Sequence, residues 1–168
     1  MKDGSVKRKP QRLKNYDYSQ NGHYFITICA YNKKHLFADI IVGQGLAPAV
    51  SIPTEYGRIV EAQLLGLEKR YDFVRIDKYV IMPNHIHAIV VLDKDILAAG
   101  ASPCPTLSDM VCVLKSMSTK LCRQAGFKEK LFQNSFHDHI IRNEDDYEMI
   151  WNYIEANPSK WAEDKYYL

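Results

Sequence analysis

Two histidines separated by one residue, His85 and His87, are the side chains best suited to hold a metal ion. They stand in a run of apolar and β-branched residues that predicts a strand over 85–92. Side chains alternate across a strand, so both imidazoles should project from one face, about 6.6 Å apart along it. Imidazoles placed in this way suit Mn, Zn, Fe or Ni. The alternative is a pair of hydrogen-bonded histidines on a half-exposed strand, and the two residues alone do not decide between these interpretations.

The segment from Asn143 to Asn157 is predicted to be a helix. It carries a second group of side chains that can act as a nucleophile or a metal ligand. Asn143 is a good N-cap, and three acids follow it in the first turn, where negative charge suits the helix dipole. Tyr153 and Asn157 are four residues apart and therefore share one ridge of this helix. The phenol can serve as a nucleophile and the amide oxygen as a metal ligand. The alternatives are a packing role for Tyr153 and a C-cap role for Asn157.

The same histidine spacing recurs at His137 and His139. Together with His85 and His87 these residues would form a four-ligand hydrolase site, which is a different chemistry. The other interpretation is that His137 and His139 are accessory groups that line a cleft or bind phosphate. The sequence leaves both interpretations open.

The elements that must position these residues follow the order β-α-β-β-α-β-α. Strands are expected over 24–30, 73–82, 85–92 and 132–141, and helices over 54–71, 106–126 and from 143 onward. A tight turn at 83–84 should join the second and third strands as an antiparallel hairpin. Residues 42–53 contain two glycines and two prolines, which predicts a loop or an irregular hairpin. The first six elements have the split β-α-β, ferredoxin-like order.

Length and composition favour one globular domain. The chain has 168 residues, of which 46% are hydrophobic and 25% are charged. No stretch approaches the roughly 20 apolar residues of a membrane-spanning helix, and the basic N-terminal segment lacks the apolar run of a signal peptide. The four cysteines form no Cys-x-x-Cys pair, which argues against a zinc ribbon and a disulfide framework. We therefore expect a reducing cytoplasm.

The net charge of +2 conceals a strong asymmetry along the chain. Residues 1–35 contain eight Lys or Arg and two Asp, whereas residues 143–168 contain seven acids and two lysines. A basic arm on a neutral or acidic body is a common way to hold a nucleic-acid backbone. Residues 12–18 also interleave aromatic with basic side chains, which can stack on unpaired bases. The alternatives are a solvated terminus and tyrosines that anchor it to the core.

Five blocks, taken in order, make the chain resemble the REP-associated tyrosine transposases, which are close relatives of the single-tyrosine HUH transposases of small bacterial insertion sequences. The blocks span nearly the whole chain: RLKNYDY at 12–18, YFITIC at 24–29, YVIMPNHIH at 79–87, FQNSFHDHIIRNE at 132–144 and YIEANP at 153–158. One departure is the Phe-Gln-Asn at 132–134, where the family commonly has Trp-Gln-Arg. The resemblance implies that the missing arginine removes a DNA contact and no catalytic group.

The resemblance implies an α+β fold, a ferredoxin-like antiparallel sheet with helices packed on it. This is the HUH endonuclease fold, whose C-terminal helix carries the nucleophilic tyrosine. By position, His85 and His87 would be the HUH histidines that hold a divalent metal, Mg²⁺ or Mn²⁺. Tyr153 would be the nucleophile. Asn157 would be the third metal ligand, at a place where related transposases carry a glutamine.

The implied activity is that of a metal-dependent single-stranded DNA endonuclease and strand transferase, a transposase. It would cleave near hairpin-forming palindromes through a covalent 5′-phosphotyrosine intermediate. The implied partner is a single-stranded DNA hairpin, with no membrane and no nucleotide cofactor, and the protein would be a monomer or a homodimer. We expect it in a bacterial cytoplasm, associated with the nucleoid. The expected organisation is a basic N-terminal arm over 1–22 and a single catalytic domain over 23–168.

Two rival functions remain open from the sequence. The first is a protein of the same fold that binds palindromic DNA without cutting it. The second is a metal hydrolase built on the four histidines, which would leave the block around Tyr153 and the basic arm unexplained.

The basic arm generates the first testable prediction. The expected DNA-contacting residues are Lys7, Arg8, Lys9, Arg12, Lys14, Tyr16 and Arg142. Replacing Arg12 and Lys14 with alanine should weaken binding to a DNA hairpin and flatten its salt dependence, because each lost phosphate contact lowers the slope of log K against log salt by about 0.9. Fluorescence anisotropy over a range of NaCl concentrations measures both quantities. An unchanged slope would remove the arm from the binding surface.

Overall fold

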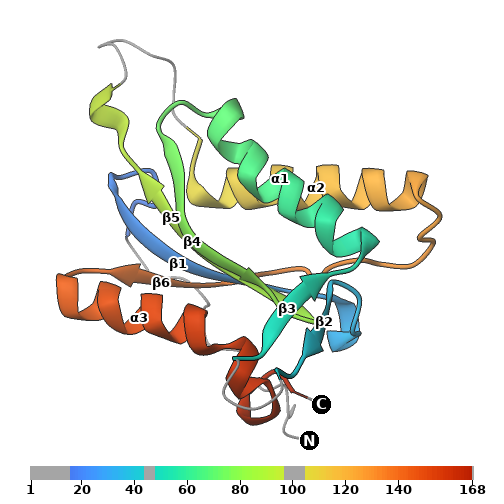
Figure 1. Ribbon diagram of the computed structural model, residues 1–168. Coiled ribbons are helices and arrows are strands. Elements are labelled where there is room, and N and C mark those ends of the chain that lie inside the picture. The colour runs from blue at the N-terminus through green and yellow to red at the C-terminus, as the bar shows by residue number, and fades with distance from the viewer. Residues whose placement is uncertain (1–15, 44–47, 97–104, 168) are drawn as a thin grey trace, which may run out of the picture.

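The computed structural model describes residues 16–43, 48–96 and 105–167, which form a sheet with helices on both faces (Figure 1). The strands are β1 (Gly22–Cys29), β2 (Ala38–Ile41), β3 (Val50–Pro53), β4 (Val74–Ile81), β5 (His85–Leu92) and β6 (His137–Ile141). The helices are α1 (Glu55–Arg70), α2 (Leu107–Gln124) and α3 (Glu144–Ala156). Three short 3-10 helices are η1 (Tyr31–Lys33), η2 (Lys94–Ile96) and η3 (Pro158–Glu163).

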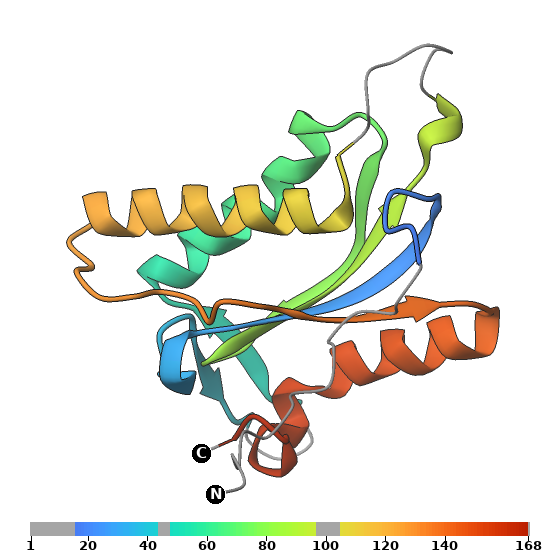
Figure 2. The ribbon, with the colours of Figure 1, turned by 180° about the vertical axis from the view of Figure 1, so that it is seen from behind.

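The main sheet is antiparallel and has the strand order β4-β5-β1-β6. This order is the one that a split β-α-β chain produces, so the predicted α+β, ferredoxin-like fold class is confirmed. Helices α1 and α2 cover one face of the sheet, and α3 covers the other (Figure 2). On the central strand β1, Thr27 lies opposite His87 of β5 and also opposite His137 of β6.

Strand β5 is buried along its whole length and divides the core into two parts. Its residues Ile86, Ala88, Val90 and Leu92 join the larger core beneath α1 and α2. Ile89 and Val91 point the other way and join a smaller core with Ile141 of β6 and with Ile150 and Ile154 of α3. Because side chains alternate along a strand, the histidines of β5 face the same side as this smaller core.

The three helices begin where the sequence predicts, and a side-chain cap fixes each start. Thr54 Oγ1 accepts a hydrogen bond from the Gly57 backbone N–H at 3.1 Å, and Thr106 forms a capping box with Asp109. Asn143 Oδ1 accepts from the backbone N–H of the third helical residue at 2.8 Å. Such caps satisfy N–H groups that the helix cannot pair internally. The cap at Asn143 thereby fixes which residues of α3 face the sheet.

One segment takes the second of its two expected forms, and another is a shorter strand than expected. Residues 42–53, expected to be a loop or an irregular hairpin, contain β3, which pairs with β2 as a separate antiparallel ribbon. Its strands have only four residues each, too few for a clear alternating pattern. The strand expected over 132–141 pairs continuously only from His137, with an isolated bridge between Phe132 and Ala30. The carbonyls of residues 133–135 instead accept hydrogen bonds from the Lys115 ammonium group.

The helices of the described ranges include none that is long and apolar enough to span a membrane.

The first turn of α1 generates a prediction about stability. A Cβ atom added to Gly57 would lie 1.8 Å from the Phe37 carbonyl oxygen, whereas one added to Gly66 of the same helix meets nothing within 4 Å. Gly57→Ala should therefore lower the free energy of unfolding by about 1–3 kcal/mol through overpacking. Gly66→Ala should raise it by roughly 0.5–1 kcal/mol, because alanine is the better helix former. Urea denaturation measures both changes, and equal effects would contradict the close approach.

Candidate active site

His85 and His87 lie side by side on the face of β5 that α3 covers. Both side chains are completely buried, and the centroids of their rings are 4.4 Å apart. The structure therefore gives the two imidazoles the common face that their spacing predicts. They stand at one end of β5, and the apolar side chains Ile89 and Val91 continue the same face toward the other end.

The orientation of His85 is set by its neighbour Asn84. His85 Nδ1 lies 2.9 Å from Asn84 Oδ1, and Asn84 Nδ2 donates to the Tyr166 carbonyl oxygen at 2.8 Å. Because Asn84 Oδ1 can only accept, Nδ1 of the neutral imidazole must carry the proton. The lone pair is therefore on His85 Nε2, which is buried without a hydrogen-bond partner among the described residues. A metal-ligating histidine is commonly held in this way, with its other nitrogen donating to an oxygen.

His87 is held at both ring nitrogens. Its Nδ1 lies 2.8 Å from Thr27 Oγ1 on the neighbouring strand β1. Its Nε2 lies 3.2 Å from the Tyr153 hydroxyl on α3. The pairing of β1 with β5 thus anchors one side of the ring, and the other side meets the tyrosine that the sequence indicates as a nucleophile.

Asp164 joins the two histidines in a potential metal site that the sequence analysis missed. One nitrogen of each imidazole and one carboxylate oxygen of Asp164 all lie within 4.8 Å of one another. Asp164 follows η3, the short helix that turns the chain back toward β5 after α3. No fixed spacing links it to the histidines, and the only sequence signal is its place among the acids of the C-terminal segment.

Asn157 lies beside Asp164 and is almost completely buried. Its Nδ2 donates to Asp164 Oδ2 at 2.9 Å, so its Oδ1 is directed elsewhere. That oxygen is buried and has no hydrogen-bond partner in the described part of the chain. Asn157 Oδ1 and His85 Nε2 are thus two buried acceptors that lack donors. A divalent cation can satisfy such acceptors, and His85, His87 and Asp164 are the described residues whose ligand atoms lie close enough together to hold one.

Burial keeps both histidines neutral. It lowers the pKa of His85 to about 4, although the charge of Asp164 acts in the opposite direction. It also lowers the pKa of His87 well below its usual value, and the neighbouring His85 adds to this shift. Neutral imidazole is the form that binds metal, so at neutral pH neither ring needs to lose a proton first.

Tyr153 is the exposed member of the group, with 38% of its surface accessible. Its hydroxyl lies 3.3 Å from Asp164 Oδ2 as well as close to His87. Desolvation raises the pKa of Tyr153 to about 12, and the negative charge of Asp164 contributes in the same direction. The phenol is therefore protonated at neutral pH and donates its proton in a hydrogen bond to Asp164 Oδ2.

A cavity of about 590 Å³ opens onto Tyr153 from the solvent side. Its lining contains Asn157 and Asp164 from the group just described, and Lys160 and Lys165 supply two cations. Glu163 also lines this cavity, so the two cations are accompanied by two carboxylates. Tyr153 and two of the candidate ligand residues therefore share one accessible space with charges of both signs.

No family model matches the chain. An uncharacterized protein of Haemophilus influenzae is 33% identical to it over 174 residues, which cover 96% of this chain and 93% of that protein. The chain belongs to the same family as this protein. A solved structure of a REP-associated tyrosine transposase bound to a REP hairpin matches with a TM-score of 0.64 and 21% identity, over 92% of this chain and 76% of that one. The fold is that of a tyrosine transposase.

Within this transposase fold, His137 and His139 lie apart from the candidate metal ligands. Both are exposed on β6, the edge strand. His139 Nε2 lies at hydrogen-bond distance, 2.8 Å, from Asp146 Oδ2 in the first turn of α3. The structure therefore does not assemble the four-histidine site of the hydrolase alternative. Arg142 is exposed immediately after β6, and its backbone N–H donates to the same Asp146 carboxylate at 3.4 Å.

Of the expected DNA contacts in the arm, only Tyr16 lies within the described residues; Lys7, Arg8, Lys9, Arg12 and Lys14 lie outside them. Tyr16 is half-buried, and its hydroxyl lies 3.2 Å from that of Tyr24. Its ring also packs edge-on against Tyr18. The aromatic part of the arm is thus anchored to the core, which was the alternative interpretation of these tyrosines.

The candidate metal ligands generate a prediction about binding. Asp164→Asn should weaken Mn²⁺ binding at least about tenfold, because groups that contact or orient metal ligands typically contribute this much. Glu163→Gln is a matched control, because it removes the same charge from the adjacent exposed residue and should leave the affinity unchanged. Isothermal titration calorimetry with MnCl₂ measures both variants. Equal affinities would exclude Asp164 from the metal site.

Proposed function

We propose that the protein is a metal-dependent endonuclease and strand transferase for single-stranded DNA, which cuts beside hairpin-forming palindromes and links itself to the DNA through Tyr153. The observation that carries this proposal is the position of the Tyr153 hydroxyl, 3.2 Å from His87 Nε2 and 3.3 Å from Asp164 Oδ2 at the base of an open cavity. A nucleophile beside candidate metal ligands is the arrangement that phosphoryl transfer requires.

His85, His87 and Asp164 would hold the divalent cation, with the unpartnered Oδ1 of Asn157 as a further ligand. Two imidazoles are softer than the ligands that Mg²⁺ usually takes, so this set favours Mn²⁺. When bound, the cation supplies Lewis-acid polarisation of the scissile phosphate. The protein residues supply the remaining functions, which are orientation, proton transfer and the nucleophile.

Tyr153 must lose its proton as it attacks. Its oxygen forms a bond to phosphorus while the bond from phosphorus to the 3′-oxygen breaks, and the departing oxygen takes up a proton to become a 3′-hydroxyl. The Asp164 carboxylate, which accepts a hydrogen bond from the Tyr153 hydroxyl, is the acceptor for the phenolic proton, because the lone pair of His87 Nε2 would be used by the cation. The charge of Asp164 also raises the pKa of Tyr153. Neutralisation of that charge in the loaded site removes one obstacle to phenolate formation.

The product is a 5′-phosphotyrosine link and a free 3′-hydroxyl. The link retains the energy of the original phosphodiester, so a second 3′-hydroxyl can attack it, release Tyr153 and join two strands. The half-exposed position of Tyr153 suits this second step, because the entering strand must reach the phosphorus from the open cavity.

The proposed substrate is a DNA hairpin with a single-stranded flank. The solved transposase that shares this fold was determined with a REP hairpin, and the basic arm gives this chain the positive charge that a DNA backbone requires. We place the arm at 1–22 and the catalytic domain at 23–168. Arg142, exposed at the end of β6, remains a proposed DNA contact in the catalytic domain.

The covalent step generates the central prediction. Wild-type protein mixed with Mn²⁺ and labelled single-stranded hairpins should give a protein–DNA band that resists SDS, and Tyr153→Phe should abolish it because phenylalanine has no nucleophilic oxygen. Tyr147→Phe is the matched control on the same helix, since Tyr147 donates to Asp77 Oδ2 at 3.0 Å and lies away from the site. It should retain the band.

The hairpins should be palindromes taken from DNA beside the gene. Binding by the wild type without any adduct would favour the protein that binds without cutting. Free cut ends without an adduct would show hydrolysis and contradict a tyrosine nucleophile. An adduct that persists in Tyr153→Phe would assign the nucleophile to another residue.

A further inference from the structure

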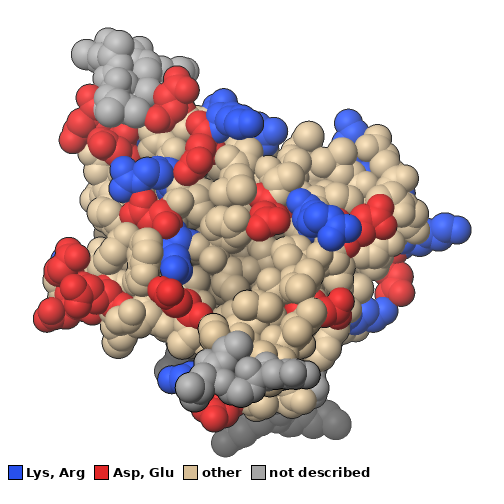
Figure 3. Space-filling view, viewed as in Figure 1, with Lys and Arg blue, Asp and Glu red and all other residues tan. Residues whose placement is uncertain are grey.

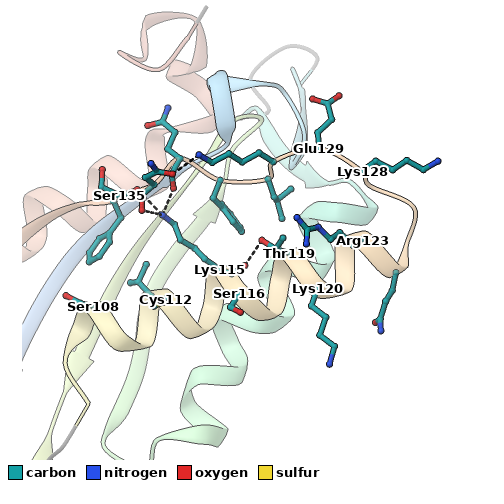
Figure 4. Close-up of a pocket in the computed structure, with 18 residues that line it drawn as sticks. Ser108, Cys112, Lys115, Ser116, Thr119, Lys120, Arg123, Lys128, Glu129 and Ser135 are labelled. Carbon is teal, nitrogen blue, oxygen red and sulfur yellow. Dashed lines mark hydrogen bonds between the residues drawn. The ribbon is translucent and has the colours of Figure 1, made fainter.

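A second cavity, of about 1130 Å³, lies between α2 and the segment 128–136 that leads into β6 (Figure 4). We call it the α2 groove. Helix α2 packs on the face of the sheet opposite α3, so this groove is separate from the cavity above Tyr153 (Figures 1 and 2). Its α2 wall runs from Ser108 to Gln124. At 1.5 Å per residue this wall is about 24 Å long.

Two lysines hold the far wall of the α2 groove: Lys115 joins it to the helix, and Lys130 lies within the wall itself. Lys115 Nζ donates to the carbonyl oxygens of Gln133 at 2.7 Å and of Ser135 at 2.9 Å. Lys130 Nζ donates to Asn134 Oδ1 at 2.6 Å and lies 4.7 Å from the centroid of the Tyr31 ring. These contacts give both lysines a structural role. They also hold the wall of the groove in one position.

Three further cations of the α2 groove have no such role. Lys120, Arg123 and Lys128 are exposed, and within the described residues none of them has an ion-pair or hydrogen-bond partner. Figure 4 shows Arg123 between α2 and the segment opposite, with Lys120 and Lys128 projecting outward. Glu129, the one carboxylate among the lining residues, is already paired with Lys34. Like charges that gather without counter-charges favour an anionic ligand.

We propose that the α2 groove binds the phosphodiester backbone of the DNA on which Tyr153 acts, an inference that rests on the proposed function. The length of the wall favours a polyanion over a small anion, because about 24 Å corresponds to roughly seven phosphates of one strand at 3.4 Å each. The groove also offers neutral donors of the kind that contact phosphates, among them Ser116, Gln133 and Asn134.

The register of the sheet connects the α2 groove to the active site. The far wall continues directly into β6, which is the edge strand. His137, the first residue of β6, lies opposite Thr27, and Thr27 lies opposite His87. The end of the groove is therefore level with the active-site histidines. Two strand spacings, about 10 Å in all, separate the backbones of β6 and β5.

The charges around α3 favour a DNA path that runs from the α2 groove across the edge of the sheet to Tyr153. The first turn of α3 carries Glu144, Asp145 and Asp146, and Figure 3 shows acidic side chains gathered over that end of the helix. DNA would be repelled there. The opposite end, where Lys160 and Lys165 line the cavity above Tyr153 together with Glu163 and Asp164, is the end close to His87. A backbone that leaves the groove beside Asn134 can thus cross the sheet edge without passing the acidic turn.

The test compares two variants that each lose one arginine and one lysine. Arg123→Gln/Lys128→Gln alters the α2 groove, and Lys69→Gln/Arg70→Gln alters exposed cations in the last turn of α1. Fluorescence anisotropy should be measured with a bare hairpin, with the same hairpin carrying a single-stranded flank, and with the flank alone. The groove variant should raise Kd about tenfold at 0.1 M NaCl and lower the slope of log K against log salt by about 1–2. The control variant should match the wild type.

The outcomes separate the sources of the phosphates. A loss on the bare hairpin assigns the groove to the duplex stem, and a loss that requires the flank assigns it to the single strand. Equal Kd and slope for both variants on all three DNAs would overturn the proposal. The adduct assay is read separately. If the wild type forms the adduct and both variants bind equally, the proposed function stands and the α2 groove is excluded as a DNA-binding site. If binding depends on the groove but no adduct forms, the α2 groove stands as a DNA-binding site and the proposed covalent function is contradicted. A wild type that binds none of the DNAs overturns both proposals.

Discussion

The alternation of side chains along β5 is the constraint on which the rest of the site depends. A strand buried on both faces must satisfy two environments, and β5 gives its even positions to the core beneath α1 and α2. Its odd positions, on the opposite face, are occupied by His85 and His87 and then by Ile89 and Val91. α3 must cover those two apolar residues, so its ridge of Ile150 and Ile154 lies against them. The Tyr153 hydroxyl is thereby brought to His87, so hydrophobic packing positions the residue that we propose as the nucleophile.

A chain of hydrogen bonds then determines what the histidines can do. Burial alone keeps the rings neutral. Which of the two ring nitrogens then carries the lone pair depends on the hydrogen bond that the other nitrogen makes. Asn84 Oδ1 accepts a hydrogen bond from His85 Nδ1, which leaves the lone pair of His85 on Nε2. Thr27, on the next strand, holds His87 at Nδ1. The sheet therefore contributes more than a platform, because its loops and neighbouring strands orient the lone pairs that a cation requires.

Much of this arrangement follows from local patterns in the sequence, and the remainder depends on contacts distant in the chain. The His-x-His spacing, the cap at Asn143 and the ridge shared by Tyr153 and Asn157 are local, so the elements and their facing sides could be predicted. Asp164 could not, because η3 has no periodic pattern that would show where it returns the chain. Residues 133–136, in the wall of the α2 groove, were predicted as part of a strand but lie outside β6, and Lys115 takes the carbonyls of residues 133–135.

The hydrogen bond from Asn84 to the Tyr166 carbonyl has a consequence for biosynthesis. The two residues are 82 positions apart, and a ribosome delivers the chain from its N-terminus at about 5–20 residues per second. The amide that orients His85 thus waits at least about four seconds for the carbonyl that holds it. During that interval the sheet can begin to form while the histidines lack their final partners. Under the proposed function, a nascent chain would therefore be unable to cut DNA until translation has passed Tyr166.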